Sequence, residues 1–493
     1  MKDKKNSLWL GLQYALSILF AFTIIKINIL HFGEALFGMW LIFLSIWNTG
    51  IALDFGFGTT LIKFIAEADN KNDTHEIALL ISNGLFFFSI LGLVIFFICV
   101  LVINILLINN TNIVPSEYHS IAIKIYPLLG INFYLQYLAY SFRSIFEGVR
   151  NFVLSSKILL TYNILNLLVV LLIKLLDLSM VNMAVGLIIN SLIYLIISFM
   201  LFQKYYNYIN IGFSLFQKKI IKRILKFSFH IQLASIFNSL IEPIVKYIIG
   251  NSYSLSLVTV YDIGRKVTIS VSGLFFATFK TLLPKASILK NTDESFLFFN
   301  TQVAEISKYG IIYSGLVFGI ASFFLAGVIK IFFITDTILL VILILALGET
   351  INNFGYAIYI FLLGIGKASF LSFIQFINLI LVVLGLFLGF LIFNNPIGLL
   401  GYFTSVLIGN ILMLLVIRKI FSDNLKLFLT NVKIHKLIAF IFLLLLSTIM
   451  LNIKKEYLYE IFTFLSVSSV LLFYNDIKSL YKKVLLIVKN LSD

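Results

Sequence analysis

The feature that most constrains the fold is a run of apolar residues from Leu79 to Leu107 that contains no charged side chain. Such a run exceeds the roughly 20 residues that an α-helix needs to cross the hydrocarbon core of a bilayer. Comparable runs recur along all 493 residues, of which 60% are hydrophobic and only 12% charged. Soluble domains carry about 25% charged residues. The chain is therefore predicted to be an integral membrane protein that crosses the bilayer many times.

The apolar runs predict an all-α polytopic membrane protein with about fourteen transmembrane helices. Their expected ranges are 8–30, 36–61, 77–107, 120–146, 155–176, 182–202, 227–250, 257–283, 308–329, 336–360, 369–393, 398–417, 437–452 and 459–474. The first run is longer than the apolar region of a signal peptide and has no cleavage motif, so we expect it to remain in the protein.

The net charge of +15 has a topological explanation. If both termini are cytoplasmic, most of the 37 Lys and Arg residues fall in cytoplasmic loops, as the positive-inside rule requires. The longest of these loops, 203–226 and 284–308, and the tail 476–493 are basic and partly apolar. Each is either an amphipathic helix on the inner leaflet or a solvated basic segment that fixes the topology.

The spacing of the runs indicates a repeat of six helices. We predict an N-terminal lobe at 1–202, a basic cytoplasmic linker at 203–226, a C-terminal lobe at 227–417, and two accessory helices with a basic tail at 418–493. Residues 52–60 and 273–281, at the ends of the second and eighth runs, are weakly similar. Two parallel repeats around a central cavity are typical of transporters.

Composition argues against several other classes of protein. The single Cys99 and five scattered His residues favour neither a disulfide framework nor a metal site, so no metal and no cofactor are expected. The dispersed basic residues do not form a nucleic-acid-binding domain. A membrane enzyme such as a polymerase or ligase would need a large outer loop with catalytic side chains, and a P-loop is absent from the sequence. We therefore predict that the protein is not an enzyme.

Three segments carry a resemblance to a known family. Residues Leu53 to Glu67 read LDFGFGTTLIKFIAE, residues Phe146 to Phe152 read FEGVRNF, and residues Gly364 to Lys367 read GIGK. In sequence and position these segments resemble the polysaccharide-biosynthesis flippases, which transport O-antigen or other lipid-linked oligosaccharides. That family belongs to the multidrug/oligosaccharidyl-lipid/polysaccharide exporter superfamily, whose MATE-like fold has two six-helix lobes.

The resemblance implies a function. It implies a flippase that moves an undecaprenyl-pyrophosphate-linked oligosaccharide, such as an O-antigen or capsular repeat unit, between leaflets of the bacterial inner membrane by alternating access. Its partners would be this glycan, membrane lipid, a coupling proton or sodium ion, and the glycan polymerase. A cation-coupled drug or small-molecule exporter of the MATE type is the alternative within the same fold.

Charged residues inside the predicted spans are the candidate site, because an ionisable group at the bilayer centre is costly and normally faces a cavity or a partner. Glu242 and Lys246, like Asp262 and Lys266, are four residues apart and share a helix face. Arg and Lys suit the oxygens of a pyrophosphate. The candidate substrate-binding residues are Arg265, Lys266, Lys246, Glu242, Asp262, Glu349, Asn353, Tyr137, Tyr140 and Lys26.

Each candidate also has a structural interpretation. The charges on the seventh and eighth spans would neutralise one another within their helices, and Lys26 would snorkel to the interface. Glu349 and Asn353 would hold helices together, and the tyrosines would anchor the bilayer interface.

A gate and a kink are also predicted. Asp54 is a candidate for an inner gate with Arg143 or Lys63, although a helix-capping role is open as well. Pro243 removes a backbone donor beside Glu242, so we expect the seventh span to bend there.

Overall fold

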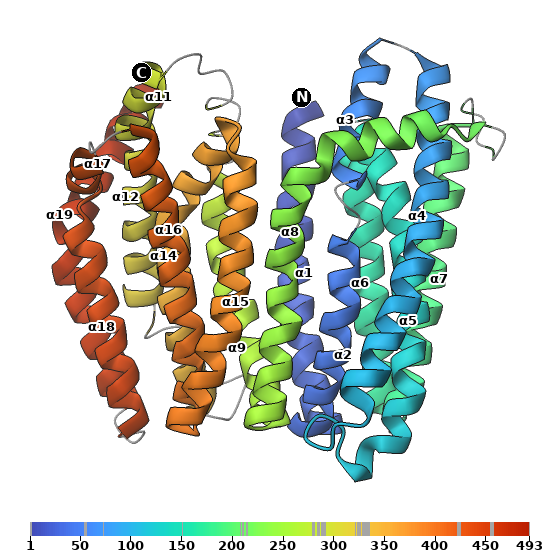
Figure 1. Ribbon diagram of the computed structural model, residues 1–493, viewed down its shortest axis with the longest axis horizontal. Coiled ribbons are helices and arrows are strands. Elements are labelled where there is room, and N and C mark those ends of the chain that lie inside the picture. Colours follow the sequence, from blue (N-terminus) through green and yellow to red (C-terminus); the bar gives the residue numbers. More distant parts are fainter. Residues whose placement is uncertain are drawn as a thin grey trace. The chain divides into compact units, whose positions relative to one another are not determined.

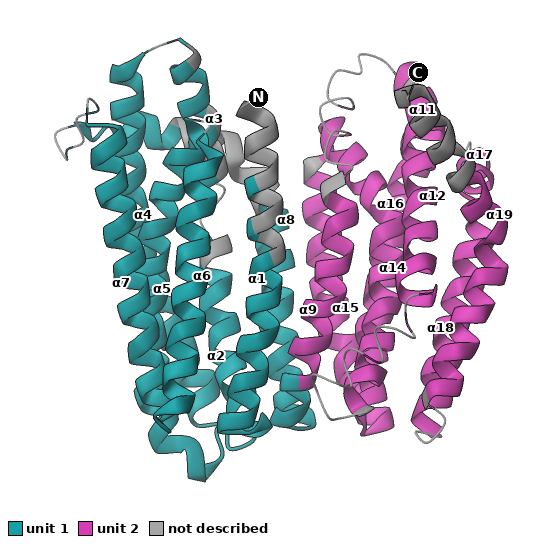
Figure 2. Cartoon of the chain, turned by 180° about the vertical axis from the view of Figure 1, so that it is seen from behind, with its two compact units in different colours: residues 1–259 teal, residues 260–493 magenta. Residues whose placement is uncertain are grey.

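The computed structural model forms two compact units, residues 1–259 and 260–493 (Figure 2). It describes residues 2–53, 57–71, 73–149, 151–207, 215–278, 292–320, 336–421, 425–453 and 458–492, with the single residues 209, 212, 282, 286, 322 and 327. Within these ranges the chain forms helices and no strand, and ten helices are long and apolar enough to cross a membrane. The predicted all-α membrane architecture is confirmed, and a total of about fourteen spans is compatible with it.

The first unit is a bundle of long helices (Figure 1). They are α1 (Lys2–Phe32), α2 (Glu34–Ala52), α3 (Phe57–Asn70), α4 (Thr74–Ile103), α5 (His119–Gly148), α6 (Phe152–Leu175), α7 (Met180–Tyr205) and α8 (Lys218–Ser252), and α9 (Leu255–Thr278) begins in this unit. A π-helical turn, Asn104–Ile108, extends α4, and a short 3₁₀ turn, Ser116–Tyr118, precedes α5.

Polar caps set the starts of several helices. The side chain of Asp73 accepts a hydrogen bond of 2.9 Å from the backbone N–H of Glu76 at the start of α4. Asn151 at α6 and Ser179 at α7 act in the same way. Such caps satisfy backbone donors that have no partner inside the helix. Between α1 and α2 the chain turns at Gly33, whose φ of 79° favours glycine.

Two boundaries differ from the sequence prediction. The predicted second span, 36–61, is divided, because α2 ends at Ala52 and α3 begins at Phe57. The last nine residues of the predicted linker, 218–226, form the start of α8. In Figure 1 this green helix first runs across the ends of its neighbours in the first unit and then turns along them.

The division between the units lies within α9, later than the predicted linker. The reason is that α8 packs on α2, α3 and α4 of the first unit. A division into compact units does not test whether the two halves of the chain repeat one another. The predicted lobes at 1–202 and 227–417 therefore stay a prediction.

The second unit contains the rest of α9 and the later helices. They are α11 (Thr292–Phe298), α12 (Ala304–Ser314), α14 (Asp336–Gly364), α15 (Ala368–Phe393), α16 (Leu400–Phe421), α17 (Leu425–Val432), α18 (Ile434–Ile453) and α19 (Leu458–Ser492). Two π-helical turns, Phe299–Val303 and Gly315–Ile320, lie on either side of α12, and a 3₁₀ turn, Pro396–Leu399, precedes α16.

Helix α14 is the central element of the second unit. It packs against α12, α16 and α18, and 94% of its most apolar stretch is buried, compared with 17% for α6. By contrast, α15 exposes large apolar side chains such as Phe373, Phe387 and Ile392, as expected for a surface that faces lipid. The polar residues Glu349, Thr350 and Asn353 of α14 are therefore enclosed by protein.

Close backbone contact holds α15 against α16. A Cβ atom at Gly385 would collide with the carbonyl of Gly401, and one at Gly401 would collide with that of Gly385. Small residues permit this approach in membranes, where helix association depends on van der Waals packing.

The two accessory helices are joined by charge. Lys433 donates to Oδ1 of Asp476 at 3.0 Å, and Lys436 donates to its other carboxylate oxygen. Helix α19 continues from the predicted last span through most of the predicted tail as one helix of 35 residues.

Candidate substrate-binding site

An ion pair between α9 and α14 forms the centre of the candidate site. Arg265 of α9 donates through Nη1 to Oε1 of Glu349 on α14. The two side chains are 18% and 4% exposed. The Nδ2 group of Asn352, one turn along α14, lies 3.4 Å from the same carboxylate oxygen. This pair joins residues 84 positions apart and was not predicted.

The aromatic ring of Tyr402 on α16 supports the same guanidinium. The Arg265 Cζ atom lies 5.7 Å from the centre of the ring, within the range of a cation–π contact. Tyr402 is buried beside Gly348 of α14. A carboxylate and an aromatic face thus position Arg265. Sequence reasoning missed Tyr402 because a lone tyrosine in an apolar helix gives no local signal.

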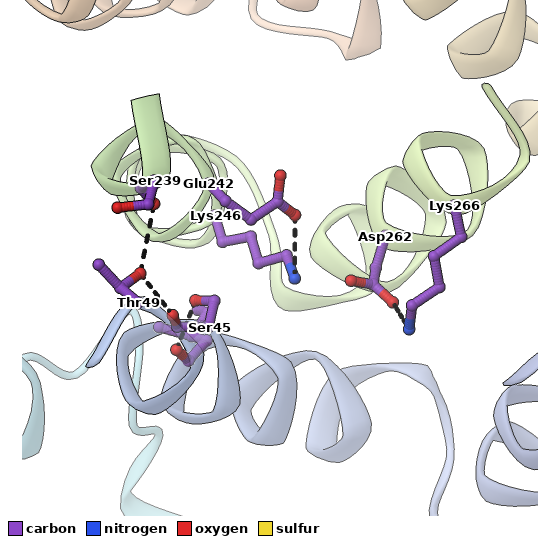
Figure 3. Close-up of polar contacts among 8 residues, drawn as sticks. Ser45, Thr49, Ser239, Glu242, Lys246, Asp262 and Lys266 are labelled. Atoms are coloured by element: carbon purple, nitrogen blue, oxygen red, sulfur yellow. Dashed lines mark hydrogen bonds and ion pairs between the residues drawn. The ribbon is translucent and has the colours of Figure 1, made fainter. Parts of the chain in front are cut away.

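The adjacent pair on α9 matches the predicted spacing. Lys266 Nζ donates to Oδ2 of Asp262 at 2.6 Å (Figure 3). The Asp262 side chain is 5% exposed and that of Lys266 is 40% exposed. The ammonium group is therefore accessible although it has a partner. Lys266 follows Arg265 directly, so α9 carries two successive cations.

In the first unit, α8 carries the other predicted pair. Lys246 Nζ lies 3.1 Å from Oε1 of Glu242, and the two side chains are 6% and 33% exposed (Figure 3). Both residues lie on α8, as the interval of four residues predicts.

Pro243 leaves one carbonyl of α8 without its helical donor, because the N–H of residue 243 would have bonded to the oxygen of Ser239. The hydroxyl of Thr49 on α2 donates to this oxygen at 3.3 Å (Figure 3). It also lies 2.9 Å from the carbonyl of Ser45. A residue of another helix thus satisfies the backbone at the proline.

Two of the remaining candidates, Asn353 on α14 and Tyr137 on α5, are buried. Asn353 is fully buried, and its Nδ2 donates to the Ser314 hydroxyl of α12 at 3.0 Å. Tyr137 is also fully buried and stacks on Phe133, with ring centres 5.5 Å apart. For either residue to contact substrate, the surrounding packing would have to open, so these assignments stay predictions.

Tyr140 and Lys26 are more accessible. Tyr140 is partly exposed and packs edge-on against Phe88 of α4, with ring centres 6.0 Å apart. Lys26 lies half-buried on α1. Both assignments stay predictions.

The predicted gate cannot be traced as a pair, because Asp54 lies outside the described residues. Arg143, its predicted partner, donates through Nε to Oε1 of Glu147 at 2.7 Å. The same oxygen accepts a hydrogen bond of 2.9 Å from Ser155 on α6. Glu147 belongs to the FEGVRNF segment, so this turn joins α5 to α6 through a charged network.

Within the described ranges, no group of three or more His, Cys, Asp or Glu side chains is arranged to hold a metal ion.

Comparison with solved structures identifies the fold. An inward-facing multidrug resistance MATE family transporter of the MOP superfamily aligns with a TM-score of 0.65 and 15% identity, over 83% of this chain and 96% of that chain. The lipid II flippase MurJ in an inward closed conformation aligns with a TM-score of 0.64 and 15% identity, over 95% and 99%. A MOP superfamily transporter from Pyrococcus furiosus aligns with a TM-score of 0.55 and 17% identity, over 86% and 95%.

The chain is a multi-pass membrane protein with a fold like that of MATE transporters and MurJ. A search of curated proteins gave no significant match. A family model described as polysaccharide biosynthesis protein matches residues 4–290, more than half of the chain. The chain belongs to this polysaccharide biosynthesis family, which confirms the family resemblance.

Proposed function

We propose that the protein is a flippase that moves an undecaprenyl-pyrophosphate-linked oligosaccharide, an O-antigen or capsular repeat unit, from the cytoplasmic to the periplasmic leaflet. It would act by alternating access in a bacterial inner membrane, with both termini in the cytoplasm. The family match and the MurJ-like fold support transport of a lipid-linked glycan. We infer that no covalent step is involved and that the protein is not an enzyme.

The observation that carries this proposal is the pair of successive cations on α9. The guanidinium of Arg265 is held by Glu349 and Tyr402, and the ammonium of Lys266 is 40% exposed. A guanidinium offers several N–H donors in a planar fork, and an ammonium acts as a point charge. The two groups together suit the closely spaced oxygens of a pyrophosphate.

Partly accessible cations with buried carboxylate partners suit the transport of an anionic head group. A pyrophosphate with sugars cannot cross hydrocarbon without a hydrated and charged path. The partners Glu349 and Asp262 offset the two cations when substrate is absent. In the proposed cycle the head group passes along the protein while the polyprenyl chain remains in lipid between helices.

The driving force has two candidates. A membrane potential acts on an anionic head group with about 2.3 kcal/mol per charge per 100 mV. Alternatively, a proton or sodium ion exchanges at Glu349 or Asp262. The glycan polymerase is a proposed partner that would consume the translocated unit. Vesicles with an imposed potential, compared with vesicles carrying an imposed cation gradient, would separate the two driving forces.

The test uses full-length protein in vesicles that contain an undecaprenyl-pyrophosphate-linked oligosaccharide. We expect R265A/K266A to abolish its flipping and, in cells, surface glycan, because the anionic head group loses both cations. The matched control is R418A/K419A, which removes the same two residue types from an exposed position at the end of α16. Normal flipping by a folded R265A/K266A protein would contradict the proposal.

A second candidate is a MATE-type exporter of drugs or other small molecules coupled to a cation. The likeness to a multidrug resistance MATE transporter favours it. Uptake of the lipophilic cation tetraphenylphosphonium into the same vesicles, without flipping of the glycolipid, would select this alternative.

A further inference from the structure

A group of aromatic rings lies near the end of α9 in the second unit. The ring of Phe276 stacks on that of Tyr356 from α14, with ring centres 4.5 Å apart and planes inclined by 23°. Both side chains are partly exposed. Beneath them, the buried Phe275 stacks on Tyr313 of α12 at 5.4 Å. Three helices thus contribute to one partly accessible aromatic surface.

Hydrogen bonds fix the orientation of these rings. The Tyr356 hydroxyl donates to the carbonyl of Phe276 at 2.9 Å, and the Tyr313 hydroxyl donates to that of Val271 at 2.7 Å. Each of these hydrogen bonds joins α9 to a tyrosine of another helix. The hydroxyls therefore hold the tyrosine ring faces in place.

The aromatic pair lies on the same stripe of α14 as the ion pair. Glu349, Asn352 and Tyr356 follow at intervals of three and four residues, so they share one helix face. Seven residues separate Glu349 from Tyr356, which corresponds to about 10 Å along a helix. Along α9, the same order runs from Arg265 to Phe276. A cationic and an aromatic surface thus adjoin on one pair of helices.

The stripe combines polar and apolar side chains. Partly exposed positions on α9 and α14 include Arg265, Lys266 and Asn352, which are costly in hydrocarbon. On the same face of α9, Ile269 is exposed as well. Exposed positions on α15 are instead apolar side chains such as Leu384 and Phe387. The tyrosine and phenylalanine rings therefore lie on a mixed surface, where a flat apolar face near hydrogen-bonding groups suits an amphipathic ligand.

We propose that the Phe276–Tyr356 pair is a sugar-binding subsite of this transporter. A pyranose ring has an apolar face of C–H groups that packs on an aromatic ring and a rim of hydroxyls that Asn352 can bind. The proposal rests on the proposed function: Arg265 and Lys266 bind the pyrophosphate, and the aromatic pair binds a sugar further along the same two helices. The aromatic pair lies about 10 Å from Glu349 along α14 and about 16 Å from Arg265 along α9. Tyr137 of the first unit, which the sequence predicts as a substrate-binding residue, is fully buried instead.

The test compares two probes on full-length protein in nanodiscs. One probe is undecaprenyl pyrophosphate, and the other is undecaprenyl pyrophosphate that carries a disaccharide of N-acetylglucosamine. We expect the wild-type protein to bind the glycosylated probe about tenfold more tightly, the order of one or two aromatic contacts. Y356A and F276L should remove this preference and leave the affinity for the bare lipid unchanged.

Control variants separate this subsite from the proposed function. Y356F keeps the ring but loses the hydroxyl that orients it, so it should keep more of the preference than Y356A, whereas R265A should weaken binding of both probes. Thermal unfolding verifies that each variant is folded, and F276L serves if Y356A does not fold. Equal binding of both probes by the wild type, or equal losses for both in Y356A and F276L, would overturn the sugar subsite alone. Failure of the wild type to bind either probe, with tetraphenylphosphonium bound instead, would overturn both proposals.

Discussion

The α8 region of the first unit and the α9–α14 region of the second unit differ in how their charges are paired. On α8, Lys246 pairs with Glu242 within one helix. On α9, Lys266 pairs with Asp262 in the same way, but Arg265 pairs with Glu349 across two helices. Asp476 of α19 likewise binds lysines at the start of α18. An ion pair within one helix is unaffected when that helix moves as a rigid body. An ion pair between two helices fixes their relative position, so it must break or be replaced by another pair when the helices move apart.

The difference extends to the surroundings of the charges. Glu349 lies on α14, which is nearly enclosed by the second unit, and its side chain is 4% exposed. The side chain of Glu242 on α8 is 33% exposed. Loss of a partner is costly for an enclosed charge and mild for an accessible one. Substitutions can therefore measure how different the two regions are.

The largest effect is expected for E349A, which leaves Arg265 without its carboxylate. Removing one partner of an enclosed pair costs about 3–5 kcal/mol, so the variant should unfold at a clearly lower temperature in detergent and should not transport. The charge-exchanged variant R265E/E349R should regain much of the stability without regaining glycolipid flipping. Restored flipping would show that the pair has only a structural role.

A somewhat smaller effect is expected for D476N. It weakens two lysine contacts between α18 and α19, and we expect a loss of about 2 kcal/mol in the free energy of unfolding. Flipping per folded molecule should be unchanged, because these helices lie outside the proposed substrate path. Thermal unfolding and vesicle assays measure the two quantities, and a folded but inactive variant would assign the accessory helices to transport.

The hydrogen bond at the proline of α8 offers an intermediate test within the first unit. T49V should cost about 1 kcal/mol, because the Ser239 carbonyl loses its donor. In the P243A background residue 243 regains its N–H, so the same T49V substitution should cost much less. This double-mutant cycle measures the coupling. Equal costs in both backgrounds would mean that the hydroxyl does not compensate for the proline.

The smallest effect is expected for K246M. The apolar stem remains, and Glu242 is accessible enough to be solvated, so we expect a change of at most about 1 kcal/mol in the free energy of unfolding. R265M should destabilise the protein more, because it leaves the enclosed Glu349 uncompensated. If chemical unfolding gave equal losses for K246M and R265M, the contrast between the two regions would be wrong.

Part of the candidate site was predictable because it follows from helix geometry. Four residues of an α-helix make about one turn, so the pairs Glu242–Lys246 and Asp262–Lys266 could be read from their spacing. The polar stripe that begins at Glu349 was also visible. Its continuation to Tyr356 follows the same periodicity, and this signal could have identified the aromatic residue on α14.

The rest was not predictable from local patterns. Residue spacing on α5 cannot show that Phe88 of α4 covers Tyr137, because neighbouring helices decide which face of α5 is covered. For the same reason Thr49 gave no sign that it would satisfy the Ser239 carbonyl of another helix.

The sequence by itself determined that this protein is a helical membrane protein with basic loops, because lipid requires long apolar helices and topology follows Lys and Arg. It also determined the charge pairs within helices. Only the tertiary structure decided that Arg265 meets Glu349 and Tyr402, and that Phe276 stacks on Tyr356. Contacts between helices depend on how side chains pack in three dimensions. The periodicity of residues along one helix does not determine which other helix packs against it.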